Sequence, residues 1–334
     1  MKRVLILGAG PAGLGAAQAL AGAGCEVCLV EKEKQIGGQP ARYTCKALEA
    51  CVQCGACLSA ELAAAVKATG IRILTQTTVR SALIGDDGRW RLLLAGSEGE
   101  EILDADAVIV TTGHSVIAPS IRQEFRHGAS PRVLTALELE HGLFDKPDWE
   151  AWLGPLPQIA MVQCFGSRDI NRGVAYCSRA CCFYANRLAR RIADSVPGAA
   201  IDLYCMDRQQ DPSGEMPAEP MGLTYIRANP ARVDLAANGT AALLFDDPEC
   251  GGPRRETYDW IVLCPAMVPG PGQLSIAARF GLPITETGFF VPEIATIHEP
   301  PVIAAGTATG PMTILESIES GRSAAFKVLR SLTA

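Results

Sequence analysis

The chain has 334 residues, which is too long for one ordinary domain and suits two or three. Apolar residues make up 48% and charged residues 20%, the composition of a globular protein. The net charge is −6 and no run of Lys or Arg occurs, which argues against nucleic-acid binding. No apolar stretch approaches the roughly 18 residues of a membrane span. The first residues imitate a signal peptide, but the glycine pattern that follows explains them better, so we expect a cytoplasmic protein.

Residues 3–31 predict a strand, a glycine-rich turn, a helix and a second strand. Apolar residues form the runs Arg3–Leu7 and Cys25–Val30, and the helical stretch Leu14–Ala23 lies between them. The turn has the sequence GAGPAG, and an acidic residue closes the second strand. This order is typical of a dinucleotide-binding βαβ unit, and the context makes specific a glycine pattern that is weak alone.

The glycines of this turn and the closing acid have separate expected roles. Gly8 makes the tight turn, Gly10 lets the backbone approach a pyrophosphate, and Gly13 lets helix and strand pack closely. The N-terminus of the helix offers free N–H groups to the phosphates, and Glu31 can accept a hydrogen bond from a ribose hydroxyl. The alternative is a glycine-rich turn that binds no ligand.

Two later segments indicate that the dinucleotide is a flavin. Ala107–Val110 predicts a buried strand that ends in Thr-Thr-Gly, and Val302–Ala305 predicts another that ends in Gly-Thr. A Gly-Pro pair then opens a predicted helix at Met312–Leu329. A flavin needs such contacts from distant strands, with a helix N-terminus near the carbonyl end of its ring. Together with Gly37-Gly38, these segments resemble the flavoproteins with two dinucleotide-binding domains, although Thr307 stands where that family usually has Asp.

An internal repeat predicts the domain organisation. A hairpin turned at Asp86-Asp87-Gly88 follows the first βαβ unit, and a second series of strand, helix and strand is followed by a hairpin turned at Asn238-Gly239. We therefore expect an α/β fold with two Rossmann-like domains of the thioredoxin reductase or flavin disulfide reductase type, carrying cysteine-rich iron–sulfur insertions. The FAD-binding domain is predicted at 1–154 plus 266–334, and the second domain at 155–265.

The second domain lacks the glycine turn that a nicotinamide site would need. After the predicted strand Ile159–Val162 the sequence is QCFGSRD, without paired glycines. A drifted but working NAD(P)H site is one interpretation. The preferred one is that this domain kept its fold and changed its ligand.

Thirteen cysteines are far more than a cytosolic enzyme needs, and eight of them fall in two clusters. The first cysteine set, Cys45, Cys51, Cys54 and Cys57, has the spacing C-x5-C-x2-C-x2-C. Three closely spaced cysteines and one outlier favour a 4Fe-4S cluster. A zinc site and a redox-active disulfide pair are the alternatives.

The second cysteine set, Cys164, Cys177, Cys181 and Cys182, has the spacing C-x12-C-x3-C-C, which matches no common ferredoxin pattern. Buried apolar cysteines are the alternative here. Three nearby arginines argue against it, because cationic neighbours stabilise thiolates and the negative charge of a cluster. Of the other cysteines, Cys25, Cys28, Cys205 and Cys264 are expected to be packing residues, and Cys250 an exposed thiol.

The runs around the second cysteine set resemble the HdrA family, the flavin-binding subunits of heterodisulfide reductases. They are CFGSRD at 164–169 and YCSRACCFYA at 176–185, and AGT at 305–307 followed by Gly310-Pro311 is similar too. The resemblance covers nearly the whole chain. It implies FAD in the first domain and an unusual 4Fe-4S cluster on the second cysteine set, close to the flavin. The chain departs from the family in having Met312 where Lys is frequent, and it lacks the added ferredoxin modules of the methanogen members.

The predicted site residues follow from these patterns and from the resemblance. FAD contacts are expected from Gly8, Gly10, Pro11, Ala12, Gly13, Glu31, Lys32, Gly38, Gln39, Val79, Thr112, Gly113, Gly306, Thr307, Thr313 and Ile314. The two cysteine sets are the predicted ligands of two 4Fe-4S clusters. No catalytic residue is assigned, since no nucleophile–base pattern occurs. His114 follows the Thr-Thr-Gly turn and either approaches the flavin or is an ordinary satisfied histidine.

The functional prediction is an oxidoreductase that transfers electrons within a larger assembly. The short chain is most similar to the HdrA-type subunit of the bacterial sulfur-oxidising heterodisulfide-reductase-like complexes. This implies partner subunits that carry the substrate chemistry, a homodimeric core, and a role in sulfur or thiol–disulfide oxidation. The alternatives are a stand-alone NAD(P)H-dependent flavin disulfide reductase with a redox cysteine pair, and a zinc-bearing scaffold with a vestigial nucleotide fold.

Overall fold

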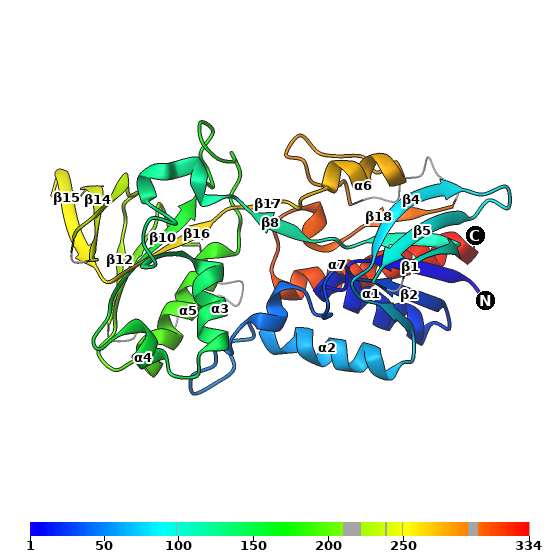
Figure 1. The fold of residues 1–334 in the computed structure, drawn as a ribbon, viewed down its shortest axis with the longest axis horizontal. Coiled ribbons are helices and arrows are strands. Elements are labelled where there is room, and N and C mark those ends of the chain that lie inside the picture. Colours follow the sequence, from blue (N-terminus) through cyan, green and yellow to red (C-terminus); the bar gives the residue numbers. More distant parts are fainter. Residues whose placement is uncertain (98, 210–221, 238, 249, 293–299, 334) are drawn as a thin grey trace. The chain divides into compact units, whose positions relative to one another are not determined.

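The computed structural model describes residues 1–97, 99–209, 222–237, 239–248, 250–292 and 300–333. The chain divides into two compact units (Figure 1). Unit 1 combines Met1–Ala41, Cys54–Ser115 and Val268–Ala334, and unit 2 combines Arg42–Gln53 and Val116–Met267. Among the residues described, no helix has the length and apolar character needed to cross a membrane.

The centre of unit 1 is a five-stranded parallel sheet in the order β18-β7-β1-β2-β3. Its strands are β1 (Arg3–Leu7), β2 (Glu26–Val30), β3 (Arg72–Leu74), β7 (Ala107–Val110) and β18 (Val302–Ala304). Because side chains alternate along a strand, Val4 and Ile6 of β1 face one side and Leu5 and Leu7 the other. The strands are apolar on both faces, as expected of a parallel sheet that is covered on both sides.

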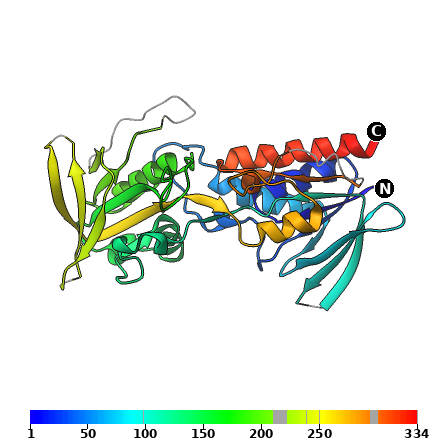
Figure 2. The same cartoon turned by 90° about the horizontal axis from the view of Figure 1, so that it is seen from above.

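Each face of this sheet has its own cover (Figure 2). Helices α1 (Pro11–Gly22), α2 (Ala56–Ala68) and α7 (Ile314–Thr333) pack on one face. The other face packs against α6 (Gln273–Phe280) and an antiparallel sheet of β4 (Thr78–Ile84), β5 (Trp90–Gly96) and β6 (Gly99–Ala105). The predicted hairpin with its turn at Asp86-Asp87-Gly88 is confirmed as β4–β5, whereas the sequence patterns do not predict β6 or helices α2 and α6.

Helices α1 and α7 approach closely because glycines leave room for backbone. A Cβ atom at Gly321 of α7 would stand 1.9 Å from the carbonyl oxygen of Ala12. A Cβ atom at Gly15 of α1 would stand 2.7 Å from the carbonyl oxygen of Ile318. The backbone of neither helix can yield without separating the pair.

Replacing Gly321 with alanine is therefore expected to lower the free energy of unfolding by about 1–3 kcal/mol, the usual cost of overpacking. Gly22→Ala is the control. Among the described residues, no heavy atom beyond its chain neighbours and its own helix backbone lies within 4 Å of its added Cβ, and alanine is the better helix former. Urea denaturation of both variants measures the difference. Equal stability of Gly321→Ala and the parent protein would contradict the packing argument.

Unit 2 repeats this architecture. Its parallel sheet has the order β12-β11-β10-β16-β9, with β9 (Val133–Thr135), β10 (Gln158–Phe165), β11 (Ala200–Tyr204), β12 (Leu223–Ile226) and β16 (Trp260–Pro265). Helices α3 (Ala136–Asp145), α4 (Trp149–Leu153) and α5 (Cys181–Ser195) pack on one face. The other face packs against an antiparallel sheet of β13 (Arg232–Leu235), β14 (Ala241–Asp247) and β15 (Gly252–Tyr258). The predicted α/β class and the predicted repeat are thus both present; Asn238 of the β13–β14 turn lies outside the described residues.

The borders of the units differ from the domain borders expected from the sequence. Residues 116–154 belong to unit 2, because β9 pairs with β16 (Val133 opposite Ile261) and α3 and α4 pack on the same sheet. Residues 42–53 also belong to unit 2 although their flanking residues belong to unit 1. Both differences arise from contacts between segments far apart in the chain, which local sequence patterns do not show.

Candidate functional site

The glycine turn after β1 contains glycines of two kinds. Gly8 has φ +105°, and an added Cβ would stand 2.4 Å from the carbonyl oxygen of Thr111. A Cβ at Gly13 would stand 1.9 Å from the carbonyl oxygen of Gly8. Packing within unit 1 therefore requires both of these glycines.

Gly10 is different, because the protein itself does not require it. Its φ of −77° is open to any residue, and an added Cβ would meet no atom closer than the Cα of Gly38 at 3.9 Å. The open space lies at the N-terminus of α1, where Gly10 is the N-cap and no side chain caps the first turn. Such a space beside uncapped N–H groups fits the pyrophosphate of a dinucleotide.

Glu31 directly follows β2 and is a buried carboxylate that the backbone holds in place. Its Oε2 accepts a hydrogen bond from the N–H of Ala9 at 2.7 Å, and its Oε1 accepts one from the N–H of Glu33 at 2.9 Å. Each oxygen keeps a second lone pair. The carboxylate therefore still has the capacity to accept from a ribose hydroxyl, and that contact stays a prediction. Its neighbour Lys32 pairs with Glu33 at the surface.

The Thr-Thr-Gly and Gly-Thr turns come together because β7 and β18 are neighbours in the sheet. A Cβ at Gly306 would stand 2.4 Å from the Cβ of Ala12, so this glycine too is required by packing. Because β1, β7 and β18 run parallel, the turns that follow these three strands lie at the same edge of the sheet, beside the start of α1. Thr112 and Gly113 remain predicted FAD contacts there.

Thr307 is paired with the histidine that follows the first of these turns. His114 Nδ1 and Thr307 Oγ1 are 3.0 Å apart, and Gln39 Nε2 donates to the carbonyl oxygen of His114 at 3.4 Å. Burial lowers the pKa of His114 to about 4, so the imidazole is neutral near pH 7. An uncharged pair thus stands where the flavoproteins of this type usually have an acid, and the pairing explains His114, whose role the sequence leaves open.

Three of the predicted FAD contacts have structural roles of their own. Thr313 forms a capping box at the start of α7, where its Oγ1 accepts from the N–H of Glu316 and its N–H donates to Glu316 Oε2. Ile314 packs against Gly55, whose added Cβ would stand 3.0 Å from it. Val79 is buried in the core of unit 1.

In unit 2, the strand β10 ends in an irregularity that reorients a cysteine. The register with β16 shifts between Val162 and Phe165, and Cys164 has φ +56°, an unusual value for a residue other than glycine. Bulges of this kind redirect a side chain and are common beside functional sites. Arg168 and Arg179, in the loop that follows, also have positive φ, at 58° each. Strained backbone is therefore concentrated around the second cysteine set.

Three thiols of the second cysteine set lie together. Cys181 hydrogen-bonds both Cys164 and Cys182, and all three are buried. This bonding lowers the pKa of Cys164 and lowers that of Cys182 to about 6, while the pKa of Cys181 rises well above its usual value. Thiolates are the form that binds metal, so the chemistry of this donor set fits an iron–sulfur cluster.

The fourth member, Cys177, lies in the loop between β10 and α5 and is only partly buried. Its Sγ accepts a hydrogen bond from the N–H of Arg179 at 3.3 Å. Arg168 pairs with Asp207 at 2.8 Å, and this hydrogen bond raises the pKa of Arg168, with smaller contributions from the nearby Cys164 and Cys177. The role of Cys177 as a ligand stays a prediction.

Two cysteines that the sequence predicts as packing residues lie beside this set. Cys205 directly follows β11 and Cys264 is the last residue but one of β16, the two strands that flank β10, and both cysteines are buried. Burial raises the pKa of Cys205 to about 11 and raises that of Cys264 as well, with further contributions from Cys164 and Cys182. A signal for this arrangement was present in the sequence: β10, β11 and β16, which are neighbours in the sheet, each have a cysteine at or just after the carboxyl end.

The first cysteine set is distributed differently. Cys45 and Cys51 belong to unit 2, while Cys54 and Cys57 belong to unit 1, where Cys57 stands in the first turn of α2. Cys45, Cys51 and Cys57 are exposed. Within the described residues no group of three or more Cys, His, Asp or Glu side chains is placed to hold a metal ion, so both predicted cluster sites stay predictions.

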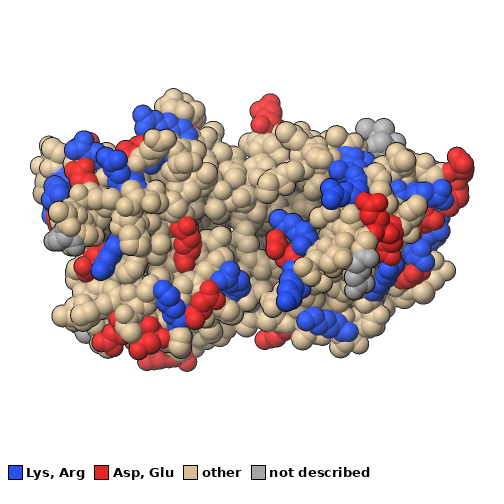
Figure 3. Space-filling model, viewed as in Figure 1, with Lys and Arg blue, Asp and Glu red and all other residues tan. Residues whose placement is uncertain are grey.

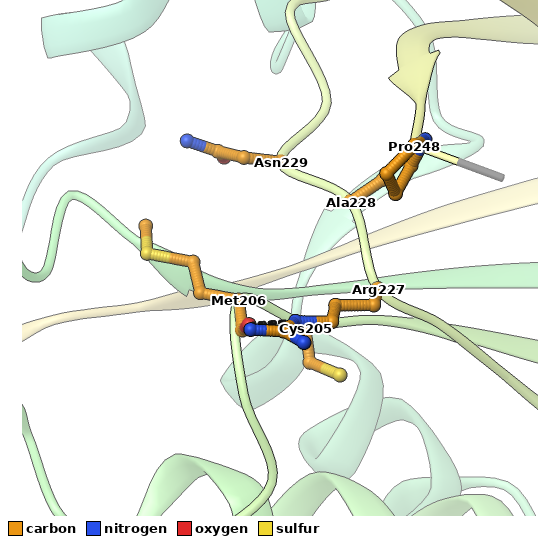
Figure 4. A pocket seen from close by; sticks show the side chains of 6 residues that line it. All are labelled: Cys205, Met206, Arg227, Ala228, Asn229 and Pro248. Atoms are coloured by element: carbon orange, nitrogen blue, oxygen red, sulfur yellow. Dashed lines mark hydrogen bonds between the residues drawn. The ribbon is translucent and has the colours of Figure 1, made fainter. Parts of the chain in front are cut away.

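A cavity of about 560 Å³ opens at the carboxyl ends of β11 and β12 (Figure 4). It is lined by Cys205, Met206, Arg227, Ala228, Asn229 and Pro248. Arg227 folds back so that its Nε donates to the carbonyl oxygen of Met206 at 3.3 Å. The cavity and the second cysteine set thus both lie at the carboxyl edge of the unit 2 sheet, the edge at which open α/β sheets bind ligands.

The comparisons with known proteins agree with this architecture. Residues 6–64 match the family model of the NAD(P)-binding Rossmann-like domain. The fold is similar to that of T. acidophilum thioredoxin reductase, with a TM-score of 0.70, 17% identity and 100% of both chains covered. It is also similar to an NAD-dependent persulfide reductase from A. fulgidus, with a TM-score of 0.62 and 17% identity over 98% of this chain and 58% of that one. The predicted fold type is confirmed.

Sequence relatives are more specific. The chain is 31% identical to the HdrA protein of the H(2):CoB-CoM heterodisulfide,ferredoxin reductase from Methanothermobacter marburgensis, over 69% of its own length and 38% of the relative's. It is 30% identical to the HdrA protein of the ferredoxin:CoB-CoM heterodisulfide reductase from Methanosarcina mazei, over 70% of its length and 31% of the relative's. The match thus spans about a third of these longer proteins. Together with the Rossmann-like fold and the cysteine-bearing edge of unit 2, this similarity supports the HdrA family of heterodisulfide reductase subunits as the family of this chain.

Proposed function

We propose that this protein is an oxidoreductase subunit that binds FAD in unit 1 and iron–sulfur clusters on its two cysteine sets, and that it transfers electrons within a heterodisulfide-reductase-like complex. The observation that supports this best is the thiol trio Cys164, Cys181 and Cys182 at the carboxyl edge of unit 2. A nicotinamide domain would carry its glycine turn at that position. Bound FAD exchanges electrons in pairs or singly, and 4Fe-4S clusters exchange them singly.

The residues of unit 1 supply binding rather than proton chemistry. Gly10 leaves room for the pyrophosphate, Glu31 offers a lone pair to the ribose, and the neutral pair of His114 and Thr307 offers hydrogen bonds without charge. The cysteines of unit 2 supply thiolates. No described residue has to act as a nucleophile or general base, which is consistent with substrate chemistry on a partner.

The proposed cellular role is sulfur or thiol–disulfide oxidation in the cytoplasm, with other subunits of the complex as partners and a homodimeric core. The similarity to proteins that are named as parts of heterodisulfide reductases supports the partner subunits. Charge does not favour a nucleic-acid partner, since positive and negative side chains are interspersed on the face shown in Figure 3.

Metal analysis of anaerobically purified protein tests the proposal. Two four-cysteine sites predict about eight iron and eight labile sulfide per chain. Cys182→Ser and Cys51→Ser are each expected to remove about half of the iron, since each breaks one set. Cys250→Ser is the control, because Cys250 is an exposed thiol outside both sets. Stoichiometric zinc without sulfide would overturn the proposal, and about four iron would mean that one set has another role.

A further inference from the structure

A buried ion pair joins the segment that carries Cys45 to the helices of unit 2. Lys46 Nζ lies 2.5 Å from Glu140 Oε1, and their side chains are 3% and 0% exposed. Lys46 directly follows Cys45, and Glu140 is on α3. Tyr184, on α5, donates to Glu140 Oε2 at 3.0 Å. The same helix begins with Cys181 and Cys182.

This network satisfies its polar groups. Glu140 Oε1 also accepts from the N–H of Thr44 at 2.6 Å and from its hydroxyl at 2.8 Å. Lys46 Nζ donates to the carbonyl oxygen of Thr44 at 2.9 Å and lies over the rings of Tyr43 and Tyr184, at 5.2 and 5.7 Å from their centroids. Side chains from three segments of unit 2 are thereby held in one arrangement.

Stability alone does not account for a buried charge pair. Apolar side chains of similar size usually stabilise a core as well as or better than a buried ion pair, because both charges lose their hydration. A fully satisfied polar network instead selects a single arrangement, since any shift leaves a charge unpaired. Residues 42–53 belong to unit 2 although the residues on either side belong to unit 1. The Lys46–Glu140–Tyr184 network supplies the buried contacts that attach residues 42–53 to unit 2.

We infer that Lys46, Glu140 and Tyr184 form a positioning network that fixes the Cys45–Cys51 segment against α3 and α5. Because α5 carries Cys181 and Cys182, the network sets the separation between those cysteines and the first half of the first cysteine set. The inference rests on the proposed function, which gives this separation its purpose. Single-electron transfer slows steeply with distance, so two metal centres must be held at a fixed spacing.

Hydrogen–deuterium exchange of the full chain tests the attachment whether or not metal is bound. Glu140→Gln removes the negative charge that pairs with Lys46 and accepts hydrogen bonds from Thr44, and it keeps the side-chain volume. We expect exchange of peptides within residues 42–53 to accelerate by about tenfold or more, with the remainder of unit 2 unchanged. Tyr184→Phe, which keeps the ring, is expected to show a smaller effect in the same peptides.

Asp145→Asn is the matched control. Asp145 is also on α3 and pairs with Arg42 of the same segment at 2.6 Å, but the two side chains are 55% and 48% exposed. An exposed pair contributes little, so exchange should change little. Unchanged exchange in Glu140→Gln would overturn the inference, and so would equal acceleration across all of unit 2, because the network would then be merely structural.

A spectroscopic measurement tests the spacing itself. In reduced, metal-loaded protein, the magnetic interaction between the two clusters depends on their separation. Glu140→Gln and Lys46→Met are expected to change that magnetic interaction while leaving the iron content at the wild-type level. Lys46→Arg keeps the positive charge and should therefore keep the wild-type interaction. An unchanged interaction would overturn the inference. Metal-free wild-type protein would instead refute the proposed function, and the exchange experiment would still decide the attachment.

Discussion

Replacing Gly10 with valine is expected to give a folded protein that retains no flavin. The backbone at Gly10 is extended, so valine is permitted there. Apart from the adjoining residues, the nearest described atom to an added Cβ is the Cα of Gly38 at 3.9 Å. The same atom would occupy the space at the start of α1 where a pyrophosphate must approach the uncapped N–H groups. The flavin absorbance of purified protein, and its recovery after incubation with FAD, measure the effect.

Two variants make this test specific. Gly13→Val is expected to lose flavin as well, but through misfolding, because its Cβ would stand 1.9 Å from the carbonyl oxygen of Gly8. Gly22→Ala should keep both flavin and stability, since its added Cβ meets no packed neighbour within 4 Å in the part of the chain that the structure describes. A Gly10→Val protein that keeps its full flavin content would show that FAD does not bind at this turn.

Neither NADH nor NADPH is expected to reduce the flavin, whereas a reduced one-electron dye should do so. In unit 1, only Gly8, Ala9 and Gly10 separate β1 from α1, and the glycines leave room for phosphate. In unit 2, the fifteen residues 166–180 separate β10 from α5, and hydrogen bonds such as that from the N–H of Val174 to the carbonyl oxygen of Gly166 fold them on themselves.

Charge opposes a nicotinamide nucleotide at the same place. Cys181 and Cys182 occupy the first turn of α5, and the pKa of Cys182 is lowered to about 6, so thiolate stands where a pyrophosphate would need N–H donors. A phosphate would be repelled there, while a metal centre on the same thiolates would be stabilised.

The rate of flavin reduction is measured by anaerobic stopped-flow mixing of oxidised protein with each nucleotide, and separately with reduced viologen as the one-electron dye. Cys182→Ser should slow reduction by the dye, and Cys250→Ser should not. Rapid bleaching of the flavin by either nucleotide at micromolar concentration would contradict the prediction. It would favour the alternative of an NAD(P)H-dependent disulfide reductase with a redox pair in the first cysteine set.

The sequence by itself determined those parts of the protein that depend on neighbours in the chain. The βαβ unit at residues 3–31, the β4–β5 hairpin and the repeat of the fold were all predictable, because strand alternation, turn glycines and helix starts are local signals. The second cysteine set was predictable as a group for the same reason, since its four members lie within nineteen residues. The difference between Gly10 and Gly13 was not, because both glycines occupy the same pattern and only packing separates their roles.

The tertiary structure alone decided which distant residues meet. In the structure His114 contacts Thr307, and Cys205 and Cys264 lie beside Cys164. Residues 42–53 and 116–154 belong to unit 2 there. The Lys46–Glu140 pair joins residues 94 positions apart, and neither residue stands in a recognisable motif. Each of these facts depends on burial and on strand order, which are set when the whole chain packs. A buried charge must be paired because leaving it unpaired costs too much free energy. Its partner can come from any part of the chain that packs beside it, so the spacing of residues in the sequence does not predict the pair.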